Sequence, residues 1–373
     1  METQEKKFRL ATGAWVAMVT PFLKDGKIDR PGIARLISFF ASNNVSGIVP
    51  MGTTGETSTL NERGHHLVIV ESVRLVHEIN SDRQEKLGIL AGCGSNSTKE
   101  AKSYVALAEA SGCDGALMVD PYYNGPSSFE IARHYYGPIA ALHPDLPIVP
   151  YIIPGRTGCE LSCADLGVLA RRYPNICAVK QATGNMDKFR ETRSITPPDF
   201  QIFSGDDDMT YQMMHETSIQ ACGVISVIAN IAPAAVQKMC QHLLHGEFEM
   251  AIAMHGKLAP LFKLVTVFAD RDVYIPEVGA ERVAHKVKDK FRNPVGIKTM
   301  MRILGMPAGP CREPLGKMTP QGMWQVMHSL QEVQKSSPEI FQPIAEFFGI
   351  DVEKRLRYPG LINGFDEENM DLS

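Results

Sequence analysis

Short, strongly apolar segments recur between residues 16 and 229, and more polar segments of helical pattern separate them. Eight such segments are found, at residues 16–21, 47–52, 87–92, 115–121, 147–153, 176–181, 201–205 and 223–229. They are apolar almost throughout and do not alternate between apolar and polar positions. This pattern is typical of parallel strands that are buried on both faces of a sheet.

The segments between these runs carry helix signals. Residues 61–80 place apolar side chains at helical spacing with charges between them, and Ser97 offers an N-cap for a helix that extends through Ala110. Residues 162–173 end in two arginines before Pro174, which is a stop signal. Strand–helix alternation of this length predicts a closed (β/α)₈ TIM barrel. The alternative is a doubly wound open sheet, which the lack of a Gly-x-Gly-x-x-Gly turn after the first strand disfavours.

The strand signals cease after about residue 232. Residues 236–269, 294–304 and 319–335 have helical patterns. We therefore expect a barrel over residues 1–231, an appended C-terminal helical region over 232–335, and a tail over 336–373.

The tail itself divides into an apolar and an acidic part. One amphipathic helix is predicted from five apolar side chains, Phe341, Ile344, Phe347, Phe348 and Ile350. The acidic segment 366–369 is predicted to be disordered.

Composition and charge exclude several classes of protein. The chain has 373 residues, a formal net charge of −4 and 44% hydrophobic residues, so nothing attracts a polyanion and no nucleic-acid partner is expected. No run of about 20 apolar residues predicts a membrane span, and residues 1–7 do not resemble a signal peptide. The eight cysteines are scattered without metal-site spacing and are expected to be buried free thiols of a cytoplasmic protein.

Polar residues at the carboxyl ends of barrel strands are the candidates for catalysis. Lys180 directly follows the apolar run 176–179. Two interpretations are open from its position alone. Its ammonium group is either solvated or paired with a carboxylate, or desolvation disfavours the charge and leaves an amine that can form an imine with a ketone.

Other strand-end residues favour the second interpretation, because imine chemistry needs groups that move protons. Tyr151 follows residues 148–150 of the fifth run, and Thr53 and Thr54 lie in a Gly-Thr-Thr-Gly loop after the second. Arg156 follows a Pro-Gly turn and could bind a carboxylate bidentately. Each also has an ordinary structural interpretation, as a barrel tyrosine, a plain turn or a surface ion pair.

Two further sets of polar residues are not expected to be catalytic. The 206–208 segment contains three aspartates, but no histidine accompanies them, and one Asp suits an N-cap before Met209. We therefore predict no metal site there. His65 and His66 lie early in a predicted helix and are expected to be solvated or packed.

Taken in order, these motifs resemble the dihydrodipicolinate synthase (4-hydroxy-tetrahydrodipicolinate synthase) family, within the N-acetylneuraminate lyase superfamily of class I aldolases. The resemblance covers roughly residues 12–330. The matching segments are 19–21 (VTP), 52–56 (GTTGE), 121–124 (PYYN), Tyr151 with 154–158 (PGRTG), 180–185 (KQATGN), 204–207 (SGDD) and 223–226 (GVIS).

The resemblance implies a set of catalytic roles. Lys180 would form a Schiff base with pyruvate, and Tyr151 would be the central proton-transfer residue. Thr53, Tyr151 and Tyr123 would form a proton relay, with Tyr123 reaching into the neighbouring subunit's site. The family's usual assembly implies a homo-oligomer, either a tetramer or a dimer.

The resemblance also implies how the substrates would bind. Thr54, with Thr53, would hold the pyruvate carboxylate, while main-chain groups at Gly205 and Ile225 would line the pyruvate pocket. Arg156 would bind the carboxylate of L-aspartate-4-semialdehyde. The implied reaction, a step of diaminopimelate and lysine biosynthesis, needs no metal and no organic cofactor.

The chain departs from the family pattern at two positions near these motifs. Ile152 replaces the usual Asn after the tyrosine, and Gln181 replaces the usual Glu after the lysine. Many members of the family are inhibited by lysine at a dimer interface. By resemblance that site would use Thr57, Ser58, His65, Asn96, Glu100 and Tyr122, although Glu62 stands where sensitive bacterial members often carry His.

Two alternative functions stay open at this point. One is a related pyruvate-dependent aldolase or lyase acting on a 2-keto-3-deoxy sugar acid or a 4-hydroxy-2-oxo acid, against which Arg156 and the 182–185 segment favour the synthase. The other is a non-catalytic binding homologue, which would be expected to have lost a relay residue, whereas Thr53, Tyr123, Tyr151 and Lys180 are all present.

Overall fold

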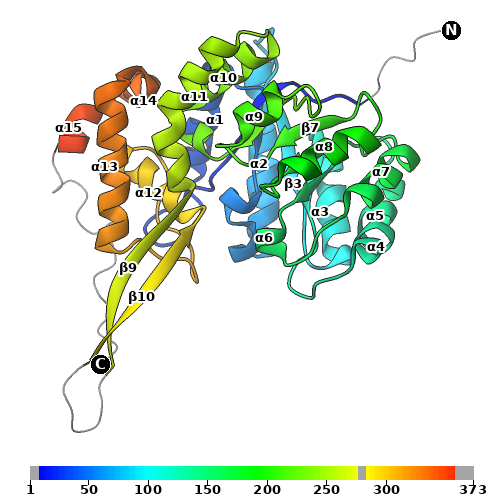
Figure 1. The fold of residues 1–373 in the computed structure, drawn as a ribbon, viewed down its shortest axis with the longest axis horizontal. Coiled ribbons are helices and arrows are strands. Elements are labelled where there is room, and N and C mark those ends of the chain that lie inside the picture. The colour runs from blue at the N-terminus through cyan, green and yellow to red at the C-terminus, as the bar shows by residue number, and fades with distance from the viewer. Residues whose placement is uncertain (1–7, 276–282, 358–373) are drawn as a thin grey trace.

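Eight parallel strands close into a barrel in the computed structural model, which describes residues 8–275 and 283–357 (Figure 1). Each strand pairs with the next, and β1 also pairs with β8, where Gly13 lies opposite Gly223. The barrel is closed, so the predicted fold is confirmed and the open sheet is excluded. The strands are β1 (Gly13–Ala17), β2 (Gly47–Val49), β3 (Gly88–Gly92), β4 (Gly115–Val119), β5 (Ile148–Ile152), β6 (Ala178–Gln181), β7 (Gln201–Ser204) and β8 (Gly223–Ser226).

Strand β1 begins earlier than the apolar pattern predicts, because Trp15 belongs to it. The Trp15 ring lies against β2 and β3, where Gly47 and Gly88 leave room for it. A Cβ atom at Gly47 would meet the ring at 2.2 Å, and one at Gly88 would meet it at 2.5 Å. The bulk of Trp15 is thus matched by two residues without side chains on the neighbouring strands.

Helices and short helical turns connect the strands on the outside of the barrel. Asn61 caps α2, since its side chain accepts from the Gly64 N–H at 2.9 Å, and Ser97 caps α3 as predicted. The connecting elements are α1 (Arg30–Ser42), η1 (Thr53–Gly55), η2 (Thr57–Thr59), α2 (Glu62–Asn80), α3 (Thr98–Ser111), α4 (Ser128–Glu130), η3 (Ile131–Tyr136), α5 (Gly137–Leu142), α6 (Pro154–Thr157), α7 (Cys163–Arg172), α8 (Met186–Ile195), α9 (Thr210–His215) and η4 (Ile228–Asn230).

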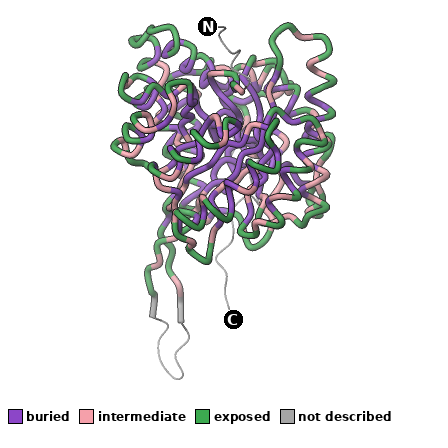
Figure 2. Tube along the Cα trace, turned by 90° about the vertical axis from the view of Figure 1, so that its right-hand side faces the viewer, coloured by how far each residue is buried: buried purple, intermediate pink, exposed green. Residues whose placement is uncertain are grey.

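Alternation along the strands creates two apolar cores. One face of each strand packs against the surrounding helices, and the other fills the barrel interior with side chains that include Trp15, Leu90, Val149 and Phe203. Figure 2 shows this buried interior within an exposed outer surface. Side chains therefore fill the barrel interior, and a ligand cavity is expected near the carboxyl ends of the strands.

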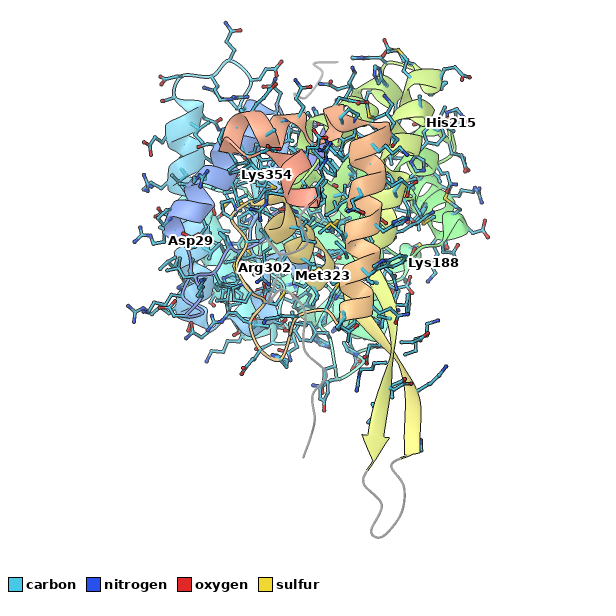
Figure 3. All side chains as sticks on the ribbon, turned by 90° about the vertical axis from the view of Figure 1, so that its left-hand side faces the viewer. Asp29, Lys188, His215, Arg302, Met323 and Lys354 are labelled. Carbon is cyan, nitrogen blue, oxygen red and sulfur yellow. The ribbon has the colours of Figure 1, made fainter. Side chains whose placement is uncertain are left out.

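The C-terminal region contains the expected helices and one element that was not predicted. Its helical elements are α10 (Pro233–Leu244), α11 (Phe248–Phe262), η5 (Lys263–Val265), α12 (Val295–Leu304) and α13 (Pro320–Ser336). Between η5 and α12, strands β9 (Thr266–Ile275) and β10 (Val283–Arg292) pair antiparallel as a hairpin, with Thr266 opposite Arg292. The hairpin projects beyond the helices, as Figure 3 shows beside α13.

The prediction that a helix continues through Ala269 is therefore wrong. From Thr266 onward the burial alternates, with Val267 and Ala269 buried and Phe268 exposed. That is the period of a strand. The apolar–polar alternation covers only a few residues before charged positions begin. The sequence pattern therefore did not distinguish this strand from the helix before it.

The described part of the tail packs onto the protein, but not as one helix. Gly349, with a φ of 66°, ends α14 (Gln342–Phe348), so η6 (Pro338–Ile340), α14 and α15 (Val352–Arg357) are separate elements. Phe348 packs against Phe39 of α1 with ring centroids 5.0 Å apart. In α15, the Arg355 guanidinium donates to the carbonyls of Ile303 and Arg302 at the end of α12, at 2.6 and 2.9 Å.

The expectations for residues 1–7 (no signal peptide) and for the acidic segment 366–369 (disorder) lie outside the described residues. All eight cysteines are free thiols, and five of them are buried. In the part of the chain that the structure describes, no helix has the length and hydropathy needed to cross a membrane.

Candidate active site

A cavity of about 240 Å³ opens at the carboxyl ends of the barrel strands. It brings together seven of the eight residues to which catalysis or substrate binding was assigned, from three strand-to-helix connections and three strands. These residues are Thr53, Thr54, Tyr151, Arg156, Lys180, Gly205 and Ile225. The cavity thus lies where a (β/α)₈ barrel normally carries its active site.

Lys180 lies near the end of β6, with only 4% of its surface exposed. In the sheet it is the register partner of Tyr151 on β5, and its Nζ lies 4.1 Å from the centroid of the Tyr151 ring. The amine is therefore held against an aromatic face inside a cavity, not in bulk solvent. Of the two interpretations of Lys180, the geometry favours the reactive one.

The two departures from the family pattern lie on the opposite face of these strands. Ile152 and Gln181 follow Tyr151 and Lys180 directly, so their side chains point away from the barrel interior. Ile152 belongs to the core between strands and helices, and Gln181 donates from Nε2 to Thr192 Oγ1 on α8 at 3.0 Å. Both substitutions therefore change packing behind the cavity and leave its lining intact.

A buried ion pair holds the end of the loop that contains Thr53 and Thr54. Glu56, at the end of this loop, has a left-handed φ of 60° and accepts from Lys298 Nζ at 2.5 Å. Thr54 Oγ1 accepts from Asn293 Nδ2 at 2.9 Å. Sequence reasoning missed both partners, although a lysine within the otherwise apolar start of α12 was a signal for Lys298.

Arg156 lies on α6 and meets the base of the β9–β10 hairpin. Its Nη2 donates to the Asn293 carbonyl at 2.9 Å, and Arg292 Nη1 donates in return to the Gly155 carbonyl at 2.7 Å. Desolvation lowers the pKa of Arg156; Tyr151 opposes this shift, and the nearby Arg292 charge adds to it. An arginine nonetheless stays protonated at physiological pH, so two cations lie side by side at this wall.

The aspartates after β7 do not cap α9, so that prediction is wrong. Asp207 instead accepts from Ser226 Oγ and from the N–H groups of Val227 and Ile228, and so it holds the β7 and β8 ends together. Asp206 lines the cavity. Desolvation, and next the charge of Asp208, raise the pKa of Asp206 to about 6. Among residues 8–275 and 283–357, no group of three His, Cys, Asp or Glu side chains is arranged to hold a metal ion.

Tyr123 is the one predicted active-site residue that does not line the cavity. Its φ is 79° and its side chain is 90% exposed. Within the described residues of this single chain, no hydrogen bond links it to Thr53 or Tyr151. One chain therefore does not bring together the three residues of the expected relay, and the exposed Tyr123 is accessible to another surface.

Four of the residues assigned to a lysine site cluster around α2 and α3. His65 is buried, hydrogen-bonded from Nε2 to the Gly92 carbonyl at 2.9 Å, and stacked on Tyr104 at 3.8 Å. Desolvation lowers the pKa of His65 to about 4. Glu100 accepts from the Tyr104 hydroxyl at 3.1 Å. Tyr104 is thus a member of this cluster that sequence reasoning missed.

Tyr122 and Asn96 are the other two members of this cluster. Tyr122 is close enough to the Glu100 charge for it to raise the Tyr122 pKa, after the larger effect of desolvation, while a backbone hydrogen bond at Asn96 opposes the shift. Thr57 and Ser58 lie on η2, just before α2. His65 is packed as expected, and His66 is partly buried.

Fold and cavity together define the class: a (β/α)₈ barrel with a buried lysine at the end of its sixth strand and a threonine loop and an arginine around the same cavity. Residues 10–276 match the Dihydrodipicolinate synthetase family. The chain belongs to this family.

Similar proteins agree with this assignment. A 4-hydroxy-tetrahydrodipicolinate synthase of Methanococcus maripaludis (strain C6) is 35% identical over 86% of this chain and 98% of its own length. The corresponding enzyme of Methylococcus capsulatus is 39% identical over 67% of this chain and 81% of its own. The solved structure of the enzyme from Methylacidiphilum fumariolicum SolV superposes with a TM-score of 0.76 at 31% identity, covering 89% of this chain and 99% of that one.

Proposed function

We propose that this chain is a 4-hydroxy-tetrahydrodipicolinate synthase, a Schiff-base-forming lyase that condenses pyruvate with L-aspartate-4-semialdehyde in diaminopimelate and lysine biosynthesis. The observation that carries the proposal is the buried Lys180 amine, held 4.1 Å from the Tyr151 ring in a cavity that also contains Thr53 and Arg156. Two relatives, each covered over more than nine-tenths of their own length, carry this name.

The first half of the reaction uses the inner end of the cavity. Thr53 and Thr54 hold the pyruvate carboxylate, and the Lys180 amine attacks the keto carbon. Loss of water from this adduct gives the imine, and removal of a proton from the methyl carbon gives the enamine. Tyr151 lies beside the amine and moves these protons, while main-chain groups at Gly205 and Ile225 line the pocket around the bound pyruvate.

The second half uses the Arg156 end. Arg156 binds the carboxylate of the semialdehyde, so that its aldehyde carbon faces the enamine. The enamine carbon attacks that aldehyde and restores the imine. The amino group of the second substrate then attacks the imine carbon, and the ring closes as Lys180 leaves as a free amine.

An assay with a panel of aldehydes tests the proposal. Pyruvate is supplied with L-aspartate-4-semialdehyde or with hydroxyaldehydes from which sugar acids would form, and product is followed by mass spectrometry. We expect turnover with the semialdehyde and a rate at least tenfold lower with the neutral hydroxyaldehydes, which Arg156 does not recognise. A preference for a hydroxyaldehyde would assign the chain to the alternative aldolases instead.

We also propose that the chain acts as a homo-oligomer, a dimer or a tetramer, in which Tyr123 completes the relay of a neighbouring subunit. Two features of Tyr123 support the proposal: the residue is 90% exposed, and it lies outside the cavity of its own chain. Light scattering at assay concentration measures the mass. A monomer with full activity would contradict this proposal.

Inhibition by lysine is a further proposal, for the cluster of His65, Asn96, Glu100 and Tyr122. It is supported by a structural neighbour, the enzyme of Cyanidioschyzon merolae, which was solved with lysine bound and is 32% identical. A titration of lysine into the assay tests it. A rate that stays flat at millimolar lysine would remove it.

A further inference from the structure

The base of the β9–β10 hairpin forms one wall of the candidate active site. Val265 and Thr266 before and in β9, and Lys290, Arg292 and Asn293 in and after β10, all line the cavity. Of these, the last three lie beyond residues 10–276, which match the family. At its base the hairpin is therefore part of the candidate active site, even though strands β9 and β10 extend away from the helices.

Two arginines meet at this wall in a reciprocal arrangement. Arg292 donates to the carbonyl next to Arg156, and Arg156 donates to the carbonyl next to Arg292. Each bond uses one of the five N–H donors of a guanidinium group. Within the described residues, neither arginine has a carboxylate at ion-pair distance.

We propose that Arg292 is a second carboxylate-binding residue for the aldehyde substrate, so that the hairpin base sets specificity at this end of the cavity. This inference rests on the proposed function. The two guanidinium groups are bonded to neighbouring carbonyls of the same wall, so their like charges repel each other. One carboxylate offers about four lone-pair sites and can accept from both guanidinium groups, which relieves that repulsion.

The same arrangement disfavours a neutral aldehyde. A hydroxyaldehyde would displace water from around Arg156 and Arg292 without supplying a negative charge, and desolvated cations without a partner are costly. The wall therefore selects aldehydes that carry a carboxylate.

The alternative is that Arg292 only anchors the α6 turn through the Gly155 carbonyl. Arg292→Gln separates the two roles, because its amide can still donate to that carbonyl but carries no charge. Lys288→Ala is the matched control. Lys288 lies on the same strand, is exposed and packs over Phe268, and it is not part of the cavity wall.

The test measures aldehyde binding without turnover. Enzyme is first loaded with pyruvate and reduced with borohydride, and its affinity is then measured for succinate semialdehyde, which has a carboxylate, and for butanal, which has none. In Arg292→Gln we expect the dissociation constant for succinate semialdehyde to rise at least tenfold, since a charge-assisted hydrogen bond is lost. The constant for butanal should stay within twofold, and Lys288→Ala should match the wild type for both.

The outcomes separate this inference from the proposed function. The role of Arg292 would be overturned if Arg292→Gln bound both aldehydes equally more weakly or bound neither more weakly. It would also be overturned if the wild type did not bind succinate semialdehyde. Selective weakening in an enzyme that nevertheless fails to turn over aspartate semialdehyde would support Arg292 and contradict the proposed function. Selective weakening together with turnover supports both.

Discussion

Removing one partner of the buried Glu56–Lys298 ion pair should destabilise the protein strongly. Both side chains are almost fully buried, with 0% and 1% of their surfaces exposed. The Glu56 carboxylate also accepts from the Arg312 N–H at 2.8 Å, and Lys298 Nζ donates to the Pro310 carbonyl at 2.9 Å. The pair therefore ties the loop of Thr53 and Thr54 to α12.

The expected magnitude follows from leaving one charge unpaired. Removing one member of a buried pair costs roughly 3–5 kcal/mol, because the remaining charge stays desolvated. Lys298→Met should therefore lower the free energy of unfolding by about 4 kcal/mol. The double variant Glu56→Gln with Lys298→Met leaves no charge at this position and should be less destabilised than Lys298→Met alone.

Urea unfolding followed by circular dichroism measures these changes. The control is Lys257→Met, because the Lys257–Glu339 pair is exposed, with 44% and 47% of the side-chain surfaces accessible. That variant should lose less than about 1 kcal/mol. If Lys298→Met is destabilised no more than Lys257→Met, the pair does not stabilise the loop and the reasoning is wrong.

Three further predictions concern single side chains. Tyr151→Phe should lower kcat by roughly 100-fold or more because it removes the proton-transfer group; an unchanged kcat would exclude Tyr151 from that role. Gly205→Ala should raise the KM for pyruvate and destabilise the protein by about 1–3 kcal/mol, because its Cβ would lie 2.6 Å from that of Ala182; unchanged kinetics would contradict the tight fit. Burial lowers the pKa of His65 from 6.5 to about 4, so stability present above pH 6.5 is lost as the pH falls toward 4. Between pH 8 and pH 5, the free energy of unfolding of His65→Gln should therefore fall by about 2 kcal/mol less than that of the wild type. Equal decreases for the two proteins in urea unfolding would refute this.

The barrel and most of the cavity could be predicted because they depend on local patterns. A repeated strand–helix unit brings every strand's carboxyl end to the same rim, so Thr53, Tyr151, Arg156 and Lys180 could be placed together without knowing any long-range contact. The rest of the cavity wall depends on how the C-terminal region folds back. Asn293 meets Thr54 across 239 positions in sequence, and no local pattern encodes that contact.

The failed predictions have similar causes. The start of β1 was missed because Trp15 fits only where Gly47 and Gly88 leave space on other strands. One aspartate of residues 206–208 was expected to cap a helix because it precedes that helix, but the Asp207 carboxylate instead accepts from N–H groups just after β8. The tail helix was broken at Gly349, where a left-handed φ replaces the helical one.

The Schiff base on Lys180 is the central claim, and trapping tests it most directly. Enzyme incubated with pyruvate and borohydride is digested and analysed by mass spectrometry, with Lys180→Arg as the control. The account predicts one reduced pyruvyl group per chain, located on Lys180, and none in the variant. A folded wild-type protein that gains no adduct, or that carries the adduct on a different lysine, would contradict the account.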